Sequence, residues 1–281
     1  MVRKLIYVIS FVLVLALASN AFAADPNVNV WTNATGNRLW VDPLNWDKGV
    51  VPGPGTHNTQ INGISYAVPG PIINAGQVAT TGDWDTWGPE WHIGLDIQGG
   101  SLLSGGAFVG LNIEGDAINS AYVNLGQGET GGSINITNFL VGDTWWWHGG
   151  GAGATYNQYS GTAIANDWIW LGGKMNLYGG YTKATNGFAM ASAGQPNTMT
   201  TLSIYAAGGG GGGGKLSLPV GLYDDGTIAG WLAAGYLVPV GGTLGYDLVS
   251  ETGRVVLYVP EPATIALLCL GGLALIRRKR S

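Results

Sequence analysis

Short runs of alternating apolar and polar residues recur along the chain, and three of them begin with a pair of glycines. These runs occupy residues 99–103, 131–136 and 172–177. Successive side chains of a β-strand point to opposite faces, so the alternation gathers the apolar residues on one face of each run. The apolar residues concerned are Leu102, Ile134, Ile136, Met175 and Leu177. The pattern therefore predicts short strands that share a buried face.

The same pattern extends over the rest of the central region. Residues 213–218 begin with another glycine pair, and alternating runs occupy residues 121–125, 245–249 and 254–259. Glycine adopts the positive φ that a sharp corner needs, so glycine pairs between short strands favour strands stacked one above another. We expect an all-β fold in which residues 99–258 form a β-solenoid of the right-handed parallel β-helix type.

The unequal spacing of the repeats leaves a second architecture open, a flat β-sandwich with long loops. Residues 143–165 interrupt the repeats and are expected to project as a loop from one turn of the coil. The seven consecutive glycines at residues 208–214 are also expected to form a loop. Glycine has no side chain to bury and loses much conformational entropy when it is ordered.

Both ends of the coil are expected to be covered, because an open end exposes unpaired backbone groups and apolar side chains. Residues 24–98 are expected to form an N-terminal cap and the first strands, with Trp31, Trp40 and Trp46 as its apolar lid. A sugar-binding platform is the alternative role for these tryptophans. Residues 228–235 are expected to form a short helix that closes the other end.

The first residues of the chain have the features of a secretory signal peptide, which we place at residues 1–23. Arg3 and Lys4 precede an apolar run at residues 5–18. Ala21 and Ala23 are the small residues of a cleavage site. The chain is therefore expected to be exported, and this segment is excluded from the fold.

The last segment, residues 259–281, has three parts. It opens with Val259, Pro260, Glu261 and Pro262, continues with an apolar run at 263–276, and ends with Arg277, Arg278, Lys279 and Arg280. As a helix rising about 1.5 Å per residue, the apolar run spans roughly 21 Å. This is short of the roughly 30 Å hydrocarbon layer, so a crossing requires local thinning or snorkelling of the basic side chains. The basic cluster is expected to stay on the cytoplasmic side.

This order of motif, hydrophobic transmembrane helix and basic cluster resembles the PEP-CTERM sorting signal of bacterial exported and surface proteins. The resemblance implies that an exosortase-type protease recognises Val259 to Pro262, cuts there and removes the helix. The membrane would then anchor the protein only transiently, and a permanent C-terminal anchor is the alternative. The glycine-pair repeats also resemble, at a general level, those of planctomycete-like surface proteins that carry this tail.

Composition and charge restrict both the fold class and the kind of partner that the protein can bind. Only 10% of the residues are charged and 49 of 281 are glycine, which disfavours long helices. Residues 24–262, the part expected to remain after removal of the signal peptide and the terminal helix, retain all seventeen acidic residues. The basic residues of this part are Arg38, Lys48, Lys174, Lys183, Lys215 and Arg254. An acidic surface argues against a nucleic-acid partner, because Lys and Arg supply most of that affinity. The single cysteine, Cys269, lies in the terminal apolar run.

Catalytic and metal-binding signatures are absent from the sequence. The three histidines are isolated, and neither a His-x-x-x-His nor a Gly-x-Ser-x-Gly pattern occurs. Carboxylate pairs occur at Asp83 and Asp85, Glu114 and Asp116, and Asp224 and Asp225. We interpret them as turn residues. A calcium site is the alternative, with Asp224 and Asp225 as candidate ligands, and acid–base work on a glycoside is a third interpretation. We expect no cofactor other than this calcium option.

Tryptophan is unusually abundant and clustered. Trp145, Trp146 and Trp147 are adjacent, and neighbouring residues of a strand cannot all face one core. At least one is expected to be exposed, where it packs against a loop or contacts carbohydrate. Tyr156, Tyr159 and Tyr181 are candidates to extend such a patch.

The sequence predicts an exported, non-catalytic protein of the cell envelope, cell surface or extracellular matrix, associated with exopolysaccharide. The alternative is a carbohydrate-binding or polysaccharide-degrading β-helix protein. The few scattered basic residues favour the non-catalytic interpretation, because enzymes that act on acidic polysaccharides usually line their grooves with Lys and Arg.

Overall fold

The structure is a computed structural model of the chain. It describes residues 28–53, 58–62, 69–80, 86–90, 94–103, 111–113, 121–142, 153–190, 200–207, 212–247 and 251–260. Regular structure in these ranges is mostly β-strand. They also hold one α-helix, α2 (Asp225–Ala233), and two short 3-10 helices, η1 (Pro43–Asn45) and η2 (Gln127–Glu129). The all-β prediction is confirmed.

The strands form three sheets, in each of which neighbouring strands are hydrogen-bonded in the following order. Sheet 1 contains β1 (Val28–Val30), β2 (Asn58–Asn62), β5 (Thr86–Glu90), β8 (Leu111–Ile113), β11 (Phe139–Val141), β14 (Trp168–Leu171) and β17 (Gly187–Met190). Sheet 2 contains β20 (Leu237–Val240), β18 (Thr201–Tyr205), β15 (Lys174–Leu177), β12 (Ala154–Gln158), β9 (Ala121–Leu125), β6 (Gly94–Gln98) and β3 (Ile72–Asn74). Sheet 3 contains β21 (Gly245–Asp247), β22 (Arg254–Tyr258), β19 (Lys215–Pro219), β16 (Tyr181–Ala184), β13 (Thr162–Ala165), β10 (Ser133–Ile136), β7 (Ser101–Leu103) and β4 (Val78–Thr80).

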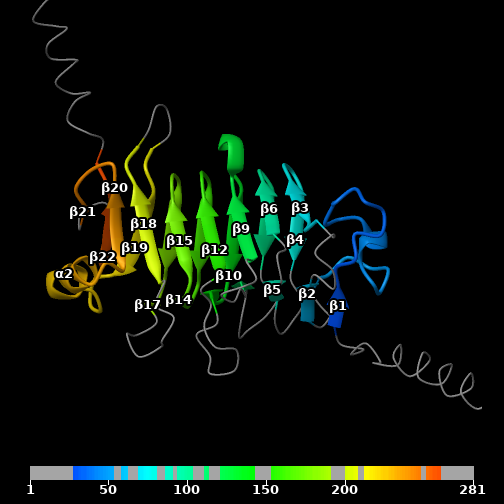
Figure 1. The fold of residues 1–281 in the computed structure, drawn as a ribbon, viewed down its shortest axis with the longest axis horizontal. Coiled ribbons are helices and arrows are strands. Elements are labelled where there is room, and N and C mark those ends of the chain that lie inside the picture. Colours follow the sequence, from blue (N-terminus) through cyan, green and yellow to red (C-terminus); the bar gives the residue numbers. More distant parts are fainter. Residues whose placement is uncertain are drawn as a thin grey trace, which may run out of the picture.

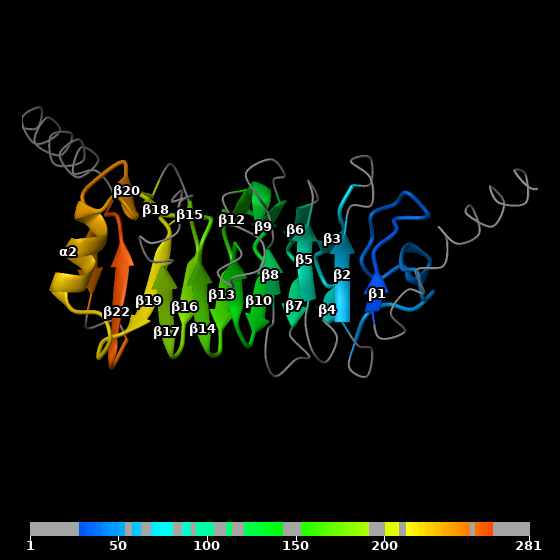
Figure 2. The same cartoon turned by 60° about the horizontal axis from the view of Figure 1, so that its bottom comes forward.

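From β2 to β19 the chain visits sheets 1, 2 and 3 in turn, so each sheet receives every third strand. Neighbouring strands in this part are parallel, and they follow one another along the long axis of the molecule (Figures 1 and 2). Residues on both sides of position 99 join the same sheets, because β6 pairs with β9 and β4 pairs with β7. The predicted boundary at residues 98 and 99 therefore falls within continuous sheets.

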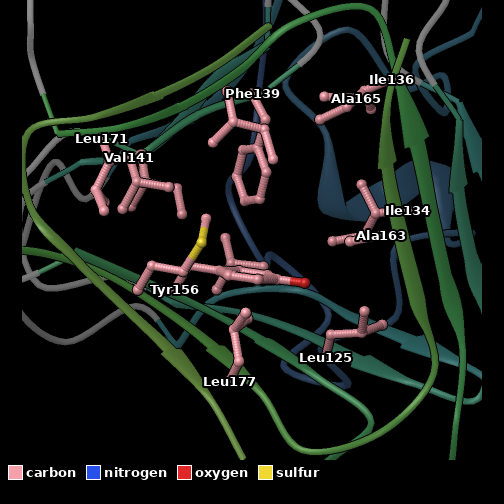
Figure 3. Packing of buried hydrophobic residues seen from close by; sticks show 14 of the residues in the cluster. Leu125, Ile134, Ile136, Phe139, Val141, Tyr156, Ala163, Ala165, Leu171 and Leu177 are labelled. Carbon is pink, nitrogen blue, oxygen red and sulfur yellow. The ribbon is translucent and has the colours of Figure 1, made fainter. Parts of the chain in front are cut away.

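The core lies between the three sheets. Strands β9 and β12 alternate strictly between buried and half-buried positions, which is the pattern of strands with one face turned inward. Figure 3 shows side chains from different sheets meeting in this interior, among them Phe139, Tyr156 and Ile134. The rings of Phe139 and Tyr156 pack edge to face with centroids 4.8 Å apart. The residues predicted to face inward are all buried: Leu102, Ile134, Ile136, Met175 and Leu177.

The prediction that the three runs that follow a glycine pair stack on one another was wrong for one of them. The runs after Gly99 and Gly131 become β7 and β10 of sheet 3, but the run after Gly172 becomes β15 of sheet 2. One turn of the chain contributes one strand to each sheet, and in the turn that contains β15 the strand of sheet 3 is β16. This strand follows Gly180, which has a φ of 76°. All three sheets carry the same alternation, so the pattern identifies the inward face of a strand and not the sheet to which it belongs.

The loop predicted over residues 143–165 was also partly wrong, because β12 and β13 lie within it. Their inward positions include Gln158, Ala163 and Ala165, which weaken the hydrophobic signal. Gln158 is buried because its amide is satisfied: Oε1 accepts from the hydroxyls of Tyr156, at 2.9 Å, and of Thr182, and Nε2 donates to a backbone carbonyl. A satisfied polar network of this kind is compatible with a packed interior.

Residues 31–46 lie at the N-terminal ends of sheets 1 and 2. Leu39 bridges to Ile72 of sheet 2, and Trp31 and Trp46 form an antiparallel bridge beside β1. Trp40 packs edge to face on Trp46 with centroids 4.9 Å apart, and the Trp46 indole donates to the Trp40 carbonyl at 2.9 Å. All three tryptophans are buried, so they offer no open ring face to a sugar and the platform alternative fails.

The opposite ends are closed by different devices. The Tyr223 hydroxyl bonds to both backbone groups of Phe188 on the edge strand β17, donating to its carbonyl at 2.5 Å. The Trp231 ring of α2 packs near the Phe188 ring, with centroids 5.9 Å apart. This helix confirms the predicted one, although it begins at Asp225. Sheet 2 ends in β20, where Pro239 has no backbone donor to offer another strand. Sheet 3 ends in antiparallel pairing of β19, β22 and β21.

Candidate contact surface and sorting segment

Many of the predicted site residues lie outside the described residues. They are Ala21, Ala23, Trp145, Trp146, Trp147, Glu261, Pro262, Arg277, Arg278, Lys279 and Arg280. The same holds for the carboxylate pairs at Asp83 and Asp85 and at Glu114 and Asp116, for the signal peptide and for the terminal apolar run. Of the helices that the structure describes, none is both long enough and apolar enough to cross a membrane.

Asp224 and Asp225, the candidate calcium ligands, lie at the start of α2. The Asp224 carboxylate accepts from the hydroxyl of Thr227 at 2.7 Å and from its backbone N–H at 2.8 Å. These hydrogen bonds hold the pKa of Asp224 below its ordinary value. Asp224 is therefore the N-cap of α2. Within the described ranges, no three His, Cys, Asp or Glu side chains are grouped closely enough to hold a metal ion. Calcium at this position stays a prediction.

Val259 and Pro260 are the described part of the sorting segment, and they follow β22 directly. Val259 is 2% exposed and belongs to the hydrophobic core, whereas Pro260 is exposed. Gly242 lies so close to Val259 that a Cβ at Gly242 would be 2.9 Å from Val259 Cγ1. The segment therefore begins inside the packed body, with no spacer between the last strand and the motif.

Arg254, the first residue of β22, fastens this strand to the rest of sheet 3. Its Nε donates to Ser217 Oγ at 2.6 Å, and its Nη atoms donate to the carbonyls of Ser217, Ala184 and Thr185. Nε also lies 3.2 Å from a carboxylate oxygen of Glu251. The planar guanidinium thus ties three segments together through one side chain.

Glu251 completes this cluster. Its carboxylate accepts from Ser217 Oγ at 2.7 Å and from the Tyr181 hydroxyl. Burial, followed by this hydrogen bond, raises the pKa of Tyr181 to about 12. Tyr181 is therefore part of a polar cluster and not of an aromatic patch. Ser217 is buried, and its hydroxyl donates a hydrogen bond to the Glu251 carboxylate, which is paired with Arg254.

A column of side-chain amides runs along the outer face of sheet 2. Asn176 donates to Asn157 at 2.9 Å, Asn157 donates to Asn124 at 3.0 Å, and Asn124 donates to Asp96 at 2.9 Å. These residues are direct neighbours in the strand register. Arg38 from the N-terminal cap closes the column with an ion pair to Asp96 at 2.9 Å, where the Asp96 side chain is 11% exposed. The carboxylate at its end is thereby neutralised.

A column of tyrosines stands beside the amides. Tyr159 stacks on Tyr178 with centroids 4.9 Å apart and an interplanar angle of 7°, and Tyr178 meets Tyr205 at 4.3 Å. Burial, followed by a hydrogen bond with Tyr205, raises the pKa of Tyr178 to about 12. All three are half-buried. We call the set Asn124, Asn157, Asn176, Tyr159, Tyr178 and Tyr205 the amide–tyrosine face. Of the tyrosines proposed from sequence, Tyr159 belongs to this face, but Tyr156 is wholly buried in the core.

The outer face of sheet 1 carries a second aromatic pair. Trp168 and Trp170 stack with centroids 5.3 Å apart, and Trp170 is 36% exposed. The Trp168 ring lies over Gly187 of the neighbouring strand, where any Cβ would overlap the ring. The glycine therefore makes the space that the indole occupies.

Sequence reasoning missed the amide column although a signal was present. Asn124, Asn157 and Asn176 each stand between two inward-facing residues of a strand, which places them on the outer face. Their separation along the chain is uneven because the connections between turns differ in length. The column becomes visible only when the strands are aligned with one another.

The comparisons with known proteins bear on the C-terminal segment alone. Residues 259–280 match the PEP-CTERM protein-sorting motif. This motif implies an exported protein that is sorted by exosortase to the cell envelope or surface. No curated protein and no solved structure matches the chain.

Proposed function

We propose that this chain is a non-catalytic protein of the cell surface or extracellular matrix, associated with exopolysaccharide. A C-terminal cut by exosortase releases it from a transient membrane anchor. The observation that carries the proposal is the sorting motif at residues 259–280, which follows the last strand of a packed β body without a spacer. A body fused so closely to a sorting signal is suited to being displayed outside the membrane.

The body itself is proposed to be a β-solenoid of the right-handed parallel β-helix type. Three parallel sheets that each take every third strand support this architecture. The continuous apolar interior and the covered ends support it as well. A flat sandwich would instead pair consecutive strands in antiparallel fashion.

Two observations support a role without catalysis. The polar cluster around Ser217 is locked by hydrogen bonds and an ion pair, and the Asp224 carboxylate serves as a helix cap. The other carboxylate pairs that a glycoside hydrolase could use, Asp83 with Asp85 and Glu114 with Asp116, are proposed to be turn residues. An assay for new reducing ends on soluble polysaccharides tests this directly. Release of reducing ends that Asp83→Asn abolishes would establish the enzymatic alternative.

Surface labelling of cells tests the proposed sorting. The full chain is expressed in a bacterium that carries an exosortase, and its lysines are labelled with a membrane-impermeant reagent. We expect the wild-type protein to be labelled and the Pro260→Ala/Pro262→Ala variant to keep its tail in the membrane fraction. Pro43→Ala changes an exposed proline outside the motif and is the matched control, which should sort normally. Wild-type protein that is unlabelled and cytosolic would contradict the proposal.

Carbohydrate binding is a second candidate function. The amide–tyrosine face favours it, because amides and tyrosine hydroxyls are the groups that bind sugar hydroxyls without a charge.

A further inference from the structure

We infer that the amide–tyrosine face binds a neutral polysaccharide chain that lies along the axis of the coil, across β9, β12, β15 and β18. The inference rests on the proposed function, because it takes the face to be displayed where such polymers occur. It names the binding surface and the class of ligand that exopolysaccharide association requires.

The charge on this face selects the class of ligand. Among the outward residues of β12, β15 and β18 the only charge is that of Lys174; the others are Thr155, Asn157, Asn176, Thr201, Ser203 and Tyr205. Asp96 at the end of the amide column is neutralised by Arg38. An anionic polymer would need a row of cations, and a cationic polymer would need a row of carboxylates. The face offers neither, although the chain as a whole is acidic.

The amide column leaves binding capacity at every step. A carboxamide has two N–H donors and two acceptor lone pairs. Within the column, Asn157 uses one donor toward Asn124 and one lone pair toward Asn176. One donor and one lone pair therefore remain for neighbouring hydroxyls of a sugar. Because the column already fixes these side chains, little rotamer entropy is lost when a ligand binds.

The tyrosine column adds a parallel row of hydroxyls and ring edges. The rings of Tyr159 and Tyr178 cover each other, so the column presents its edges and not its stacked faces to a ligand. The raised pKa of Tyr178 keeps its hydroxyl protonated at every physiological pH, and a protonated phenol both donates and accepts a hydrogen bond. Apolar ring edges next to hydroxyls complement the mixed surface of a sugar ring.

The repetition of these groups points to a polymer. The amides occupy equivalent positions of β9, β12 and β15 in the strand register. Tyr159, Tyr178 and Tyr205 each stand two residues further along the chain, at the ends of β12, β15 and β18, and pack on one another. Adjacent strands lie about 4.8 Å apart. An amide and a tyrosine stand together at β12 and β15, and the row continues with Asn124 on one side and Tyr205 on the other. A small molecule would occupy one or two steps, whereas a chain of like units can use the whole row.

The test uses the full chain purified in detergent, run on native gels that contain hydroxyethyl cellulose as a neutral polymer or alginate as an anionic one. We expect the neutral gel to retard the wild-type protein. The Asn157→Ala/Tyr178→Ala variant should bind at least about tenfold more weakly, as expected for the loss of two or more net hydrogen bonds. Asn135→Ala is the matched control, because Asn135 is an exposed amide of sheet 3 that accepts from Asn166. It should bind like the wild type.

A second variant covers the case in which the first one fails to fold. Ser203 follows Asn176 in the register and is half-buried, so Ser203→Lys blocks the row and leaves the stacked rings in place. Thermal melts establish which variants are folded. Folded variants that bind like the wild type would overturn the inference, as would a wild-type protein that is retarded by alginate alone or by neither polymer.

These outcomes are separate from those of the surface-labelling experiment. A correctly sorted protein without affinity for the neutral polymer would overturn the binding face and leave the proposed sorting intact. A protein that binds the neutral polymer but stays in the cytosol would overturn the proposed sorting and leave the binding face intact.

Discussion

The side-chain amide of Asn157 donates a 3.0 Å hydrogen bond to the side-chain oxygen of Asn124, which is its neighbour in the adjacent turn and 33 residues earlier in the chain. The bond is made outside the core, on a face that solvent reaches. It links two turns through side chains in addition to the backbone ladder. Contacts of this kind between turns should therefore contribute to the stability of the body.

Removal of the middle amide should loosen the column. Asn157→Ala deletes two hydrogen bonds, each worth about 0.5–1.5 kcal/mol when net exchange with water is counted. We expect the free energy of unfolding to fall by about 1–2 kcal/mol, as measured by urea denaturation. Asn135→Ala, which removes an acceptor from one exposed amide pair, should cost less. Equal losses in both variants would show that the column adds nothing.

The space over Gly187 should be essential for the position of Trp168. A Cβ at Gly187 would overlap the indole, so Gly187→Ala forces the ring to move. Overpacking of this kind typically costs about 1–3 kcal/mol, and the tryptophan fluorescence should change with it. Gly230→Ala is the control: this glycine lies in α2 with open space around it. That change should stabilise the helix by roughly 0.5–1 kcal/mol.

Arg254 should be the main fastening of the last strand. Arg254→Gln removes the charge that balances Glu251 and several of the bonds to sheet 3. Breaking a buried ion pair by removing one partner costs about 3–5 kcal/mol, and breaking a partly exposed one costs less. We therefore expect the free energy of unfolding to fall by about 2–3 kcal/mol. Limited proteolysis should then reach β22 sooner. Lys215→Gln, which removes an exposed cation from β19, is the control and should behave like the wild type.

Stability should depend on pH through Glu251. Burial raises its pKa, but hydrogen bonds from Tyr181 and Ser217 and the charges of Lys183 and Arg254 outweigh burial, so the folded-state pKa lies below the ordinary 4.5. A depressed pKa means that this contribution is complete above pH 4.5 and is lost as the pH falls through the folded-state value. Glu251→Gln should flatten that part of the stability curve in thermal melts. If the melting temperature of this variant falls at low pH as steeply as that of the wild type, Glu251 is not the group responsible.

Sequence patterns predicted where strands occur better than they predicted which strands pair with one another. Alternation identified the inward faces of residues such as Leu102 and Ile134, because it reports only which face of a strand is apolar. It did not assign the run after Gly172 to its sheet, since all three sheets use the same alternation. It missed β12 and β13, where a buried amide and two alanines replace large apolar residues.

The candidate sites divide in the same way. The sorting segment is contiguous, so its residues identify it without any structure, and the match at residues 259–280 confirms it. The amide–tyrosine face is assembled from strands whose spacing along the chain is uneven, and only the register brings Asn157 beside Asn176. Tyr156 and Tyr159 differ by three positions and lie on opposite faces, which only a correct strand assignment separates.

Residue Val259 sets a limit on where the sorting segment can be cut. It is packed against Gly242 in the core, whereas Pro260 is exposed. We therefore expect a protease that acts on the folded protein to cut no earlier than Pro260. A glycine–serine spacer that ends in valine, inserted directly after Val259, keeps Val259 in the core and leaves a complete Val-Pro-Glu-Pro motif beyond the spacer. This insertion should leave the body intact and make cutting at least as efficient. Slower cutting of the spacer variant would contradict this.

The most direct measurement is the intact mass of the protein extracted from the cell envelope of a host that carries an exosortase. We predict the mass of a chain that begins at Ala24 and ends at or shortly after Pro260, before the apolar run at residues 263–276. The mass of all 281 residues, recovered from the cytosol with both terminal segments attached, would contradict the proposed export and sorting.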